Sequence, residues 1–272
     1  MNSKIVQGVR VPEIGLGTFK LIGKTGQEAI RTALNIGYRH IDTAQVYNNE
    51  KMVGESIKQS YVERDQMFIT SKIDRLNLEP RKLLTSVERT LMNLKMEYVD
   101  LLLIHWPNPD VDIRITLETM FSLKEQGRAL HIGLSNFPMN QCVQIVEDIG
   151  MPIFCNQVEY HAMLGQFDLL DFAADHDVLI TAYSPLAQGE ILNNPLLLEI
   201  GNKYQKSAAQ IALRWLIEQE QVVVILKSAT AKHLQENFDI YDFELEDEDF
   251  YAIDDLDKSM RVVNPNFAPN WN

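Results

Sequence analysis

Short apolar runs recur along the chain at fairly regular distances. Eight runs rich in branched and aromatic residues are each followed by turn residues and then usually by a helical pattern of apolar positions. The runs end near Gly17, Asp42, Lys72, His105, Ser135, Gln157, Ser184 and Lys227, so that consecutive ends lie 22 to 43 residues apart. A strand, a helix and their connections need about that length. The pattern therefore predicts eight βα units.

Signals for the beginning of a helix lie between the runs. Thr25 with Glu28, and Ser207 with Gln210, have the spacing of a capping box. Pro80 and Pro138 stand where two further helices are expected to begin. An eightfold strand–helix alternation with no linker predicts an α/β fold, a single (β/α)8 TIM-barrel domain spanning residues 1–272. A doubly wound open sheet is the alternative.

Three segments fall outside this repeat. The stretch KIVQGVRVPE, before Gly15, predicts an N-terminal hairpin that plugs the bottom of the barrel. The longest spacing, after the seventh strand, predicts an inserted loop over residues 187–206. The last residues, RVVNPNFAPNWN, predict a short irregular C-terminal tail. Because exposed aromatic rings are costly, we expect Phe267 and Trp271 to fold back over the mouth of the barrel.

Composition narrows the classes of function. The chain is 46% hydrophobic and 23% charged, which is typical of a globular protein. A net charge of −13 argues against nucleic acid and anionic membranes as partners, since both need basic patches. No apolar signal segment or long apolar run is present. The two cysteines, Cys142 and Cys155, lack metal-ligand spacing, so we expect no metal site, and this sparse use of cysteine suggests a reducing cytoplasm. We also expect a monomer.

Polar residues gather where the predicted strands end. The apolar run LLLIHWPN stops at His105, and the two preceding strands end at Asp42 and Lys72. Taken alone, His105 fits an ordinary core histidine. In a closed barrel, however, three consecutive strand ends are neighbours around one mouth, and TIM-barrel active sites form there. These three side chains therefore predict an active site.

Tyr47 joins them, because HIDTAQVYNNE places it in the loop just beyond Asp42. A phenol has an ordinary pKa near 10, which is high for donating a proton at neutral pH. A neighbouring lysine ammonium lowers a phenol pKa, and a carboxylate holds the ammonium in place. We therefore expect Tyr47 to be a proton donor tuned by Lys72 and Asp42, with His105 holding a carbonyl oxygen.

The chain resembles the aldo-keto reductase family over its whole length. Within that family it is most similar to the bacterial 2,5-diketo-D-gluconate and methylglyoxal reductases. The matching segments are GLGTFK, GYRHIDTAQVYNNEKMVG, FITSKI, YVDLLLIHWPN, IGLSNF, NQVEYH, AYSPLAQG and ILKSATAKHLQENF. The resemblance implies that Asp42, Tyr47, Lys72 and His105 form the family's catalytic tetrad. It also implies a nicotinamide cofactor, usually NADPH, with NADH as an alternative.

The resemblance further implies which residues bind this cofactor. A Rossmann fingerprint is absent, since GLGTFK lacks the third glycine and the spacing. The implied contacts follow the extended dinucleotide. They are Ser135, Asn136, Gln157 and Tyr183 at the nicotinamide, Ser184, Leu186 and Gln188 at the pyrophosphate, and Lys227, Ser228, Thr230, His233, Glu236 and Asn237 at the adenosine end.

The sequence departs from the family at two of these places. The common proline before the Lys-Ser pair is Leu226, and the common arginine that holds the 2′-phosphate is His233. A neutral imidazole offers no charged bidentate contact, so strict selectivity for NADPH is weakened.

The expected reaction is reduction of a small carbonyl compound. Phe19, Trp106 and Tyr47 would form an apolar wall for substrates such as 2-oxoaldehydes and keto-sugar acids, 2,5-diketo-D-gluconate among them. The alternative is a non-catalytic nicotinamide-binding relative on the same fold, because a fold alone does not imply catalysis.

Overall fold

The computed structural model describes residues 2–271, and eight of its strands close into a parallel barrel. The order around the barrel is β10-β3-β4-β5-β6-β7-β8-β9, so strands that follow one another in sequence are neighbours. The closed ring excludes the open doubly wound sheet. The strands are β3 (Ile14–Gly17), β4 (His40–Asp42), β5 (Phe68–Ile73), β6 (Val99–Ile104), β7 (Ala129–Ser135), β8 (Cys155–Glu159), β9 (Leu179–Tyr183) and β10 (Val222–Leu226).

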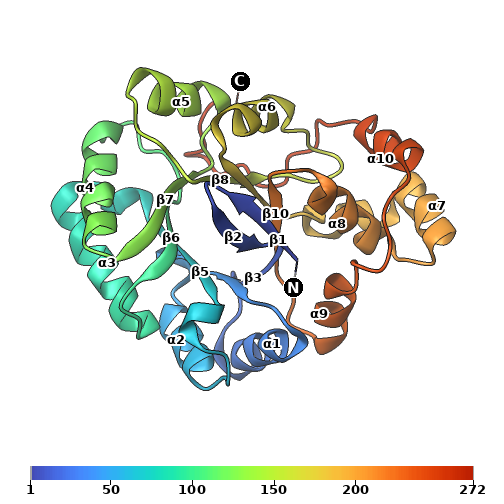
Figure 1. Ribbon diagram of the computed structural model, residues 1–272, viewed down its shortest axis with the longest axis horizontal. Helices are drawn as coiled ribbons and strands as arrows, with labels where there is room; N and C mark the ends of the chain where they lie inside the picture. The colour runs from blue at the N-terminus through green and yellow to red at the C-terminus, as the bar shows by residue number, and fades with distance from the viewer. Residues whose placement is uncertain (1, 272) are drawn as a thin grey trace.

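Helices surround this ring (Figure 1). Those that connect or follow the barrel strands are α1 (Gly23–Ile36), α2 (Glu50–Lys58), α3 (Pro80–Leu94), α4 (Ile113–Glu125), α5 (Met139–Val143), α6 (Phe167–His176), α8 (Ala208–Glu218) and α9 (Ala231–Phe238). Two more, α7 (Pro195–Tyr204) and α10 (Asp247–Asp254), lie outside the repeat. No helix within residues 2–271 is both long and apolar enough to cross a membrane.

Local sequence signals explain most helix beginnings. Ser207 caps α8 in a full capping box with Gln210, and Pro80 is the first residue of α3. Pro138 is the N-cap of α5, as expected. The capping box expected at Thr25 is wrong. Helix α1 begins at Gly23, two residues earlier, with Ile22 as its N-cap and no side-chain cap.

The segment after β9 is the second correction. The inserted loop expected over residues 187–206 is largely helical, because it contains the 3₁₀ helix η5 (Ala187–Asn193) and α7. Asn194 caps α7 by accepting hydrogen bonds from the backbone N–H groups of Leu196 and Leu197, and Pro195 opens the helix. This Asn-Pro pair is a helix-start signal within the segment that was expected to be a loop.

The predicted N-terminal hairpin is confirmed, with β1 (Ser3–Val6) and β2 (Val9–Pro12) pairing antiparallel around a turn at Gln7 and Gly8. Figure 1 shows this hairpin against the centre of the ring. Val6 and Val11 are fully buried and pack against Phe68, Leu101 and neighbours inside the barrel. The hairpin therefore seals the end of the barrel opposite the carboxyl ends of the strands.

One glycine shows how closely the outer layer is packed. A Cβ atom at Gly54 in α2 would collide with the backbone of Leu94, the last residue of α3. Only glycine permits this approach. The contact fixes α2, and with it the loop that precedes it, against α3.

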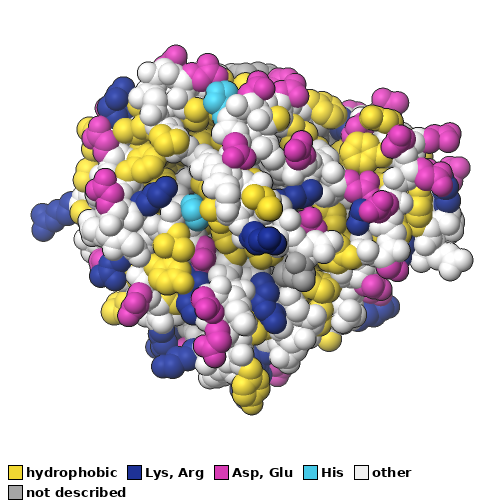
Figure 2. Space-filling view, viewed as in Figure 1, with side chains coloured by type: hydrophobic (Ala, Val, Ile, Leu, Met, Phe, Trp, Pro, Cys, Tyr) yellow, Lys and Arg dark blue, Asp and Glu magenta, His cyan; other side chains and the backbone are white. Residues whose placement is uncertain are grey.

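Acidic residues dominate part of the surface. In the face shown in Figure 2, acidic side chains gather over α7 and α10. Helix α10 alone has Asp247, Glu248 and Asp249 in its first turn, where the helix dipole favours negative charge.

Candidate active site

Four residues implied by sequence meet at the carboxyl ends of three adjacent strands. Asp42 ends β4, Lys72 lies next to the end of β5, and His105 directly follows β6. Tyr47 ends the 3₁₀ helix η1 (Gln45–Tyr47) in the loop after β4. Because β4, β5 and β6 are hydrogen-bonded neighbours, the four side chains share one side of the barrel mouth.

A buried ion pair lies at the centre of the group. Lys72 Nζ is 2.5 Å from Asp42 Oδ1, and the two side chains are 1% and 3% exposed. Nζ also donates to the carbonyl oxygen of Thr43 at 3.0 Å, and Gln157 Nε2 donates to Asp42 Oδ2 at 2.9 Å. Burial lowers the pKa of Lys72, but Asp42 and Tyr47 outweigh that effect, so its pKa is raised and the ammonium stays charged.

The third donor position of this ammonium faces Tyr47. Lys72 Nζ is 3.4 Å from the Tyr47 hydroxyl oxygen and 5.1 Å from the ring centroid. Burial raises the pKa of Tyr47, while the Lys72 charge lowers it. The net direction is upward, so the expected lowering of the Tyr47 pKa by Lys72 is wrong. Removing a phenolate from water costs more here than the nearby ammonium returns.

His105 and Phe19 complete the walls around Tyr47. The His105 ring lies edge-on to the Tyr47 ring with the centroids 5.7 Å apart, and the Phe19 ring lies tilted to it with the centroids 5.1 Å apart. Burial, with Lys72 adding to it, places the pKa of His105 well below the usual 6.5. A neutral imidazole therefore stands beside the hydroxyl, with a buried Nδ1 atom that has no protein partner within residues 2–271.

Residues expected at the nicotinamide form one connected network. Asn136 Nδ2 donates to the His105 carbonyl oxygen at 2.9 Å, and the Tyr183 hydroxyl donates to Asn136 Oδ1 at 2.7 Å. Ser135 donates to the carbonyl oxygen of Gln157 at 2.9 Å, while the Gln157 side chain reaches Asp42. The structure therefore brings these four residues to the tetrad.

The residues expected at the pyrophosphate lie in an unusual loop after β9. Ser184, Ala187 and Gln188 all have positive φ, at 49°, 46° and 55°. Such conformations cost non-glycine residues energy and cluster at ligand-binding segments. Leu186 is half-buried and Gln188 is exposed. No hydrogen bond joins the Ser184 or Gln188 side chain to the tetrad in the described chain.

The residues expected at the adenosine end gather around the start of α9. Lys227 directly follows β10 and is exposed, without an ion pair among residues 2–271. Thr230 caps α9 by accepting from the His233 backbone N–H, and also donates its own N–H to Ser228 Oγ. His233 and Glu236 are exposed on α9, while Asn237 is buried.

This donor set fits an extended anionic dinucleotide. An exposed ammonium and two hydroxyls stand at the end of β10, where TIM barrels often bind phosphate. The loop with positive φ follows β9, the neighbour of β10, and β9 ends at Tyr183, which is hydrogen-bonded to Asn136. Lys227, Ser228 and Thr230 would hold phosphate, and Asn136 and Gln157 would meet the carboxamide.

The tail covers the neighbouring part of the mouth, as expected. The rings of Phe267 and Trp271 pack edge-on against Trp106 at 5.5 and 6.0 Å. Arg75 lies over the Phe267 ring at 4.8 Å, and Arg261 lies over Trp271 at 3.9 Å. Trp106 immediately follows His105, so the tail closes over the predicted substrate wall.

Sequence reasoning missed the residues that hold these segments in place. Glu159 ends β8 and accepts the backbone N–H groups of Val262 and Val263 at 2.7 and 2.8 Å, which anchors the tail. Asn49 donates to the carbonyl oxygens of Thr18 and Leu21 at 2.7 and 3.0 Å. Glu159 lies in NQVEYH and Asn49 lies in YNNE, two segments that carry the family resemblance. Their place in these segments was the only feature of the sequence that could have identified them.

Comparison with known proteins agrees with the site. The sequence profile described as "Aldo/keto reductase family" matches residues 13–258. The chain belongs to the aldo/keto reductase family. It is 40% identical over 260 residues to glyoxal reductase of Bacillus subtilis (strain 168), covering 95% of this chain and 94% of that protein. It is 36% identical over 262 residues to methylglyoxal reductase DkgA of Yersinia pestis, covering 95% and 94%.

Solved structures give the same result. A crystal structure named provisionally as a 2,5-diketo-D-gluconic acid reductase B is 39% identical, with a TM-score of 0.96 over 100% of this chain and 98% of that one. MGS-M4, an aldo-keto reductase from a Medee basin deep-sea metagenome library, is 35% identical with a TM-score of 0.93, covering 98% and 99%. This aldo/keto reductase is therefore an oxidoreductase that reduces carbonyl groups with a nicotinamide cofactor, and the non-catalytic alternative is set aside.

Proposed function

We propose that this aldo/keto reductase uses NADPH to reduce small 2-oxoaldehydes or keto-sugar acids, such as 2,5-diketo-D-gluconate, to alcohols, with Tyr47 as the general acid. The observation that carries the proposal is the buried Asp42–Lys72 pair with its ammonium 3.4 Å from the Tyr47 hydroxyl. Related proteins named glyoxal reductase and methylglyoxal reductase support the substrate class.

Each tetrad residue has a role that follows from its environment. A reduced nicotinamide bound here would supply the hydride. As the carbonyl carbon gains it, the carbonyl oxygen gains an electron pair and takes the proton of the Tyr47 hydroxyl. Lys72 stabilises the phenolate that remains, and Asp42 keeps Lys72 in place. His105, neutral because burial lowers its pKa, donates a hydrogen bond to the oxygen and orients it.

The walls of the site support a small substrate. Phe19 and Tyr47 form one apolar side, and Trp106, covered by Phe267 and Trp271, forms another. The preference for NADPH over NADH rests on Lys227, Ser228 and Thr230, which offer one charge and two hydroxyls to a 2′-phosphate. His233 would make that preference smaller than an arginine would.

Two further points belong to the proposal. The hairpin at one end of the barrel and the tail at the other both pack on the barrel, which supports a single working domain over residues 1–272. Cys142 and Cys155 are free buried thiols, which supports a reducing cytoplasm. The expected monomer stays a prediction.

The test is Tyr47→Phe, which removes the proton donor and keeps the ring. Carbonyl-dependent loss of NADPH absorbance should fall by about 100-fold or more, the usual scale of general acid catalysis. NADPH affinity, measured by fluorescence titration, should stay within about twofold, because the hydroxyl makes no proposed cofactor contact. Wild-type turnover in this variant would contradict the role of Tyr47, and a wild-type protein inactive on every carbonyl tested would contradict the function.

A further inference from the structure

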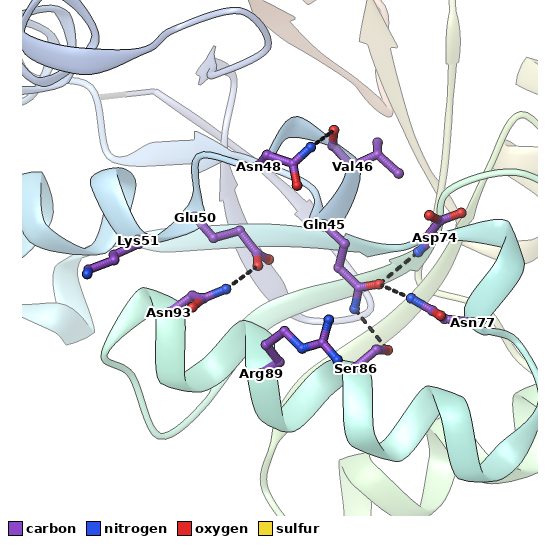
Figure 3. A pocket seen from close by; sticks show the side chains of 10 residues that line it. All are labelled: Gln45, Val46, Asn48, Glu50, Lys51, Asp74, Asn77, Ser86, Arg89 and Asn93. Carbon is purple, nitrogen blue, oxygen red and sulfur yellow. Dashed lines mark hydrogen bonds between the residues drawn. The ribbon is translucent and has the colours of Figure 1, made fainter.

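A polar cavity of about 520 Å³ lies behind the loop that carries Tyr47 (Figure 3). Its walls come from η1, from the first turn of α2, from α3 and from the loop that follows β5. Gln45, the first residue of η1, extends its side chain across this space toward α3 and the β5 end (Figure 3). The cavity therefore lies between the loop that carries Tyr47 (residues 43–49, called the tyrosine loop below), helix α3 and the segment after β5.

The Gln45 amide uses all of its hydrogen-bonding positions there. Its Nε2 atom donates to Ser86 Oγ at 3.0 Å and to Thr90 Oγ1 at 3.3 Å, both on α3. Its Oε1 atom accepts from the backbone N–H of Asp74 at 3.0 Å and from Asn77 Nδ2 at 3.1 Å. A side-chain amide has two donors and one oxygen with two lone pairs, so none is left over.

These four bonds connect the segment that carries Tyr47, the proposed proton donor, to the segment that carries Lys72. Gln45 lies two residues before Tyr47, and Asp74 lies two residues after Lys72. One amide thus ties the tyrosine loop, the end of β5 and helix α3 to one another. Each such bond adds modestly to stability, and several on one planar amide also fix its direction.

The other end of the loop is fastened separately. Glu50 accepts from Ser71 Oγ at 2.9 Å and from Asn93 Nδ2 at 3.3 Å. Asn49 is buried and also holds this end, through its hydrogen bonds to the carbonyl oxygens of Thr18 and Leu21, while Val46 and Asn48 are exposed. The Tyr47 hydroxyl itself has one hydrogen bond in the described chain, the long one from Lys72. Its place is therefore decided by the residues on either side of it.

We propose that Gln45 is a positioning residue for carbonyl reduction: it sets the distance between the Tyr47 hydroxyl and Lys72 Nζ by joining both segments to α3. The inference rests on the proposed role of Tyr47 as proton donor. Gln45 does not touch the reacting atoms, so it acts through geometry alone. Displacement of a catalytic group by about 1 Å can cost a large factor in rate.

The first test is Gln45→Met, which keeps the length of the side chain and removes its four hydrogen bonds. We expect kcat to fall about tenfold, with KM for the carbonyl and Kd for NADPH within about twofold of wild type. The pH at which kcat falls to half should also move upward. When Lys72 lies farther from the hydroxyl, it lowers the pKa of Tyr47 less.

Two further variants separate positioning from general damage. Arg89→Gln is the matched control, because Arg89 lines the same cavity from α3 and makes no side-chain hydrogen bond or ion pair within residues 2–271. It should keep wild-type kcat and the wild-type pH profile. Gln45→Glu keeps acceptor oxygens for Asp74 and Asn77, so its kcat should lie between wild type and Gln45→Met. It also carries the test if Gln45→Met does not fold.

The outcomes distinguish the two proposals. If Tyr47→Phe is inactive while Gln45→Met has the wild-type kcat and pH profile, the positioning role is wrong and the proposed function stands. If Gln45→Met only lowers the melting temperature and leaves the pH profile in place, Gln45 is structural and the inference is overturned. If Tyr47→Phe is fully active, the proposed function of Tyr47 fails first.

Discussion

Lys72 carries the positive charge beside the Tyr47 hydroxyl. Its ammonium is enclosed by the Asp42 carboxylate, the Thr43 carbonyl oxygen and the Tyr47 hydroxyl. Lys72→Met should lower kcat by about 100-fold or more, because the phenolate left after proton transfer loses its counter-charge. The variant should also be less stable, by about 3–5 kcal/mol, since it leaves a buried carboxylate unbalanced.

The double variant Asp42→Asn with Lys72→Met separates these effects. It removes both charges together and should regain much of the stability, measured by urea unfolding, without regaining turnover. Activity that returned with stability would show that Lys72 serves the fold and not the proton transfer.

His233 is the residue expected to set how much more tightly the protein binds NADPH than NADH. A guanidinium keeps its charge at every physiological pH and offers two parallel donors, whereas an imidazole does neither. His233→Arg should tighten NADPH by about 1–2 kcal/mol, the scale of one charge-assisted hydrogen bond. NADH, which lacks the 2′-phosphate, is the matched control and should bind as before. Equal changes for both cofactors in fluorescence titrations would place His233 away from the phosphate.

Individual residues show which features of this site could be predicted from the sequence and which could not. Asp42, Lys72 and His105 were predictable because each ends a strand of a closed barrel, and Tyr47 because it follows so soon after. The expected lowering of the Tyr47 pKa was wrong, because the effect of Lys72 was foreseen and the larger effect of burial was not. Gln45 carried no signal, since its four partners lie between 29 and 45 residues away.

At the scale of elements, a capping-box spacing predicted the start of a helix correctly only where the side chain caps the backbone at that point. Ser207 with Gln210 forms the expected capping box, but the same spacing at Thr25 does not, because α1 has already begun at Gly23. Gly23 has a φ of 56°, which suits a turn into the helix. Helix α7 was missed because the eightfold repeat does not require it.

The C-terminal tail is the element with the clearest separate prediction. Deleting residues 264–272 removes Phe267 and Trp271 from Trp106 and leaves the Glu159 anchor at Val262 and Val263 intact. We expect KM for carbonyl substrates to rise severalfold and the order of preferred substrates to change, with NADPH affinity within about twofold. The measurement is kcat/KM over a panel of aldehydes and keto acids, with Trp271→Phe as the control that keeps an aromatic ring. An unchanged panel would mean that the tail does not shape the site.

At the scale of the whole molecule, the repeat of eight strands was sufficient to predict closure. Strand neighbours in sequence became neighbours in space, and polar strand ends met at one mouth. The hairpin followed from its position before the first barrel strand. The repeat did not predict that polar residues would be buried inside the barrel. One of them is His40, whose Nε2 atom shares a hydrogen bond of 3.0 Å with Thr70 Oγ1.

That burial predicts how the molecule responds to acid. Burial lowers the pKa of His40 and of His131 to about 4 and that of His105 well below 6.5. The unfolded chain, in which histidine titrates near 6.5, therefore binds more protons than the folded one below that pH. The resulting stability is fully present above about pH 6.5 and is lost as pH falls toward 4. Burial raises the pKa of Glu13, Asp100 and Asp254, which opposes part of this loss.

The free energy of unfolding should therefore fall by about 3 kcal/mol between pH 7.5 and 5.5, roughly 1.4 kcal/mol for each of the two deeply buried histidines, His40 and His105, and the partly buried His131 adds to the fall. Urea unfolding at fixed ionic strength measures it. His40→Gln is the informative variant, because it keeps a polar partner for Thr70 but cannot gain a proton, and its slope with pH should be smaller than that of wild type by the share of one buried histidine. If the free energies of wild type and His40→Gln changed with pH in the same way between 7.5 and 5.5, the imidazole of His40 would be protonated inside the barrel at no cost, and the prediction would be wrong.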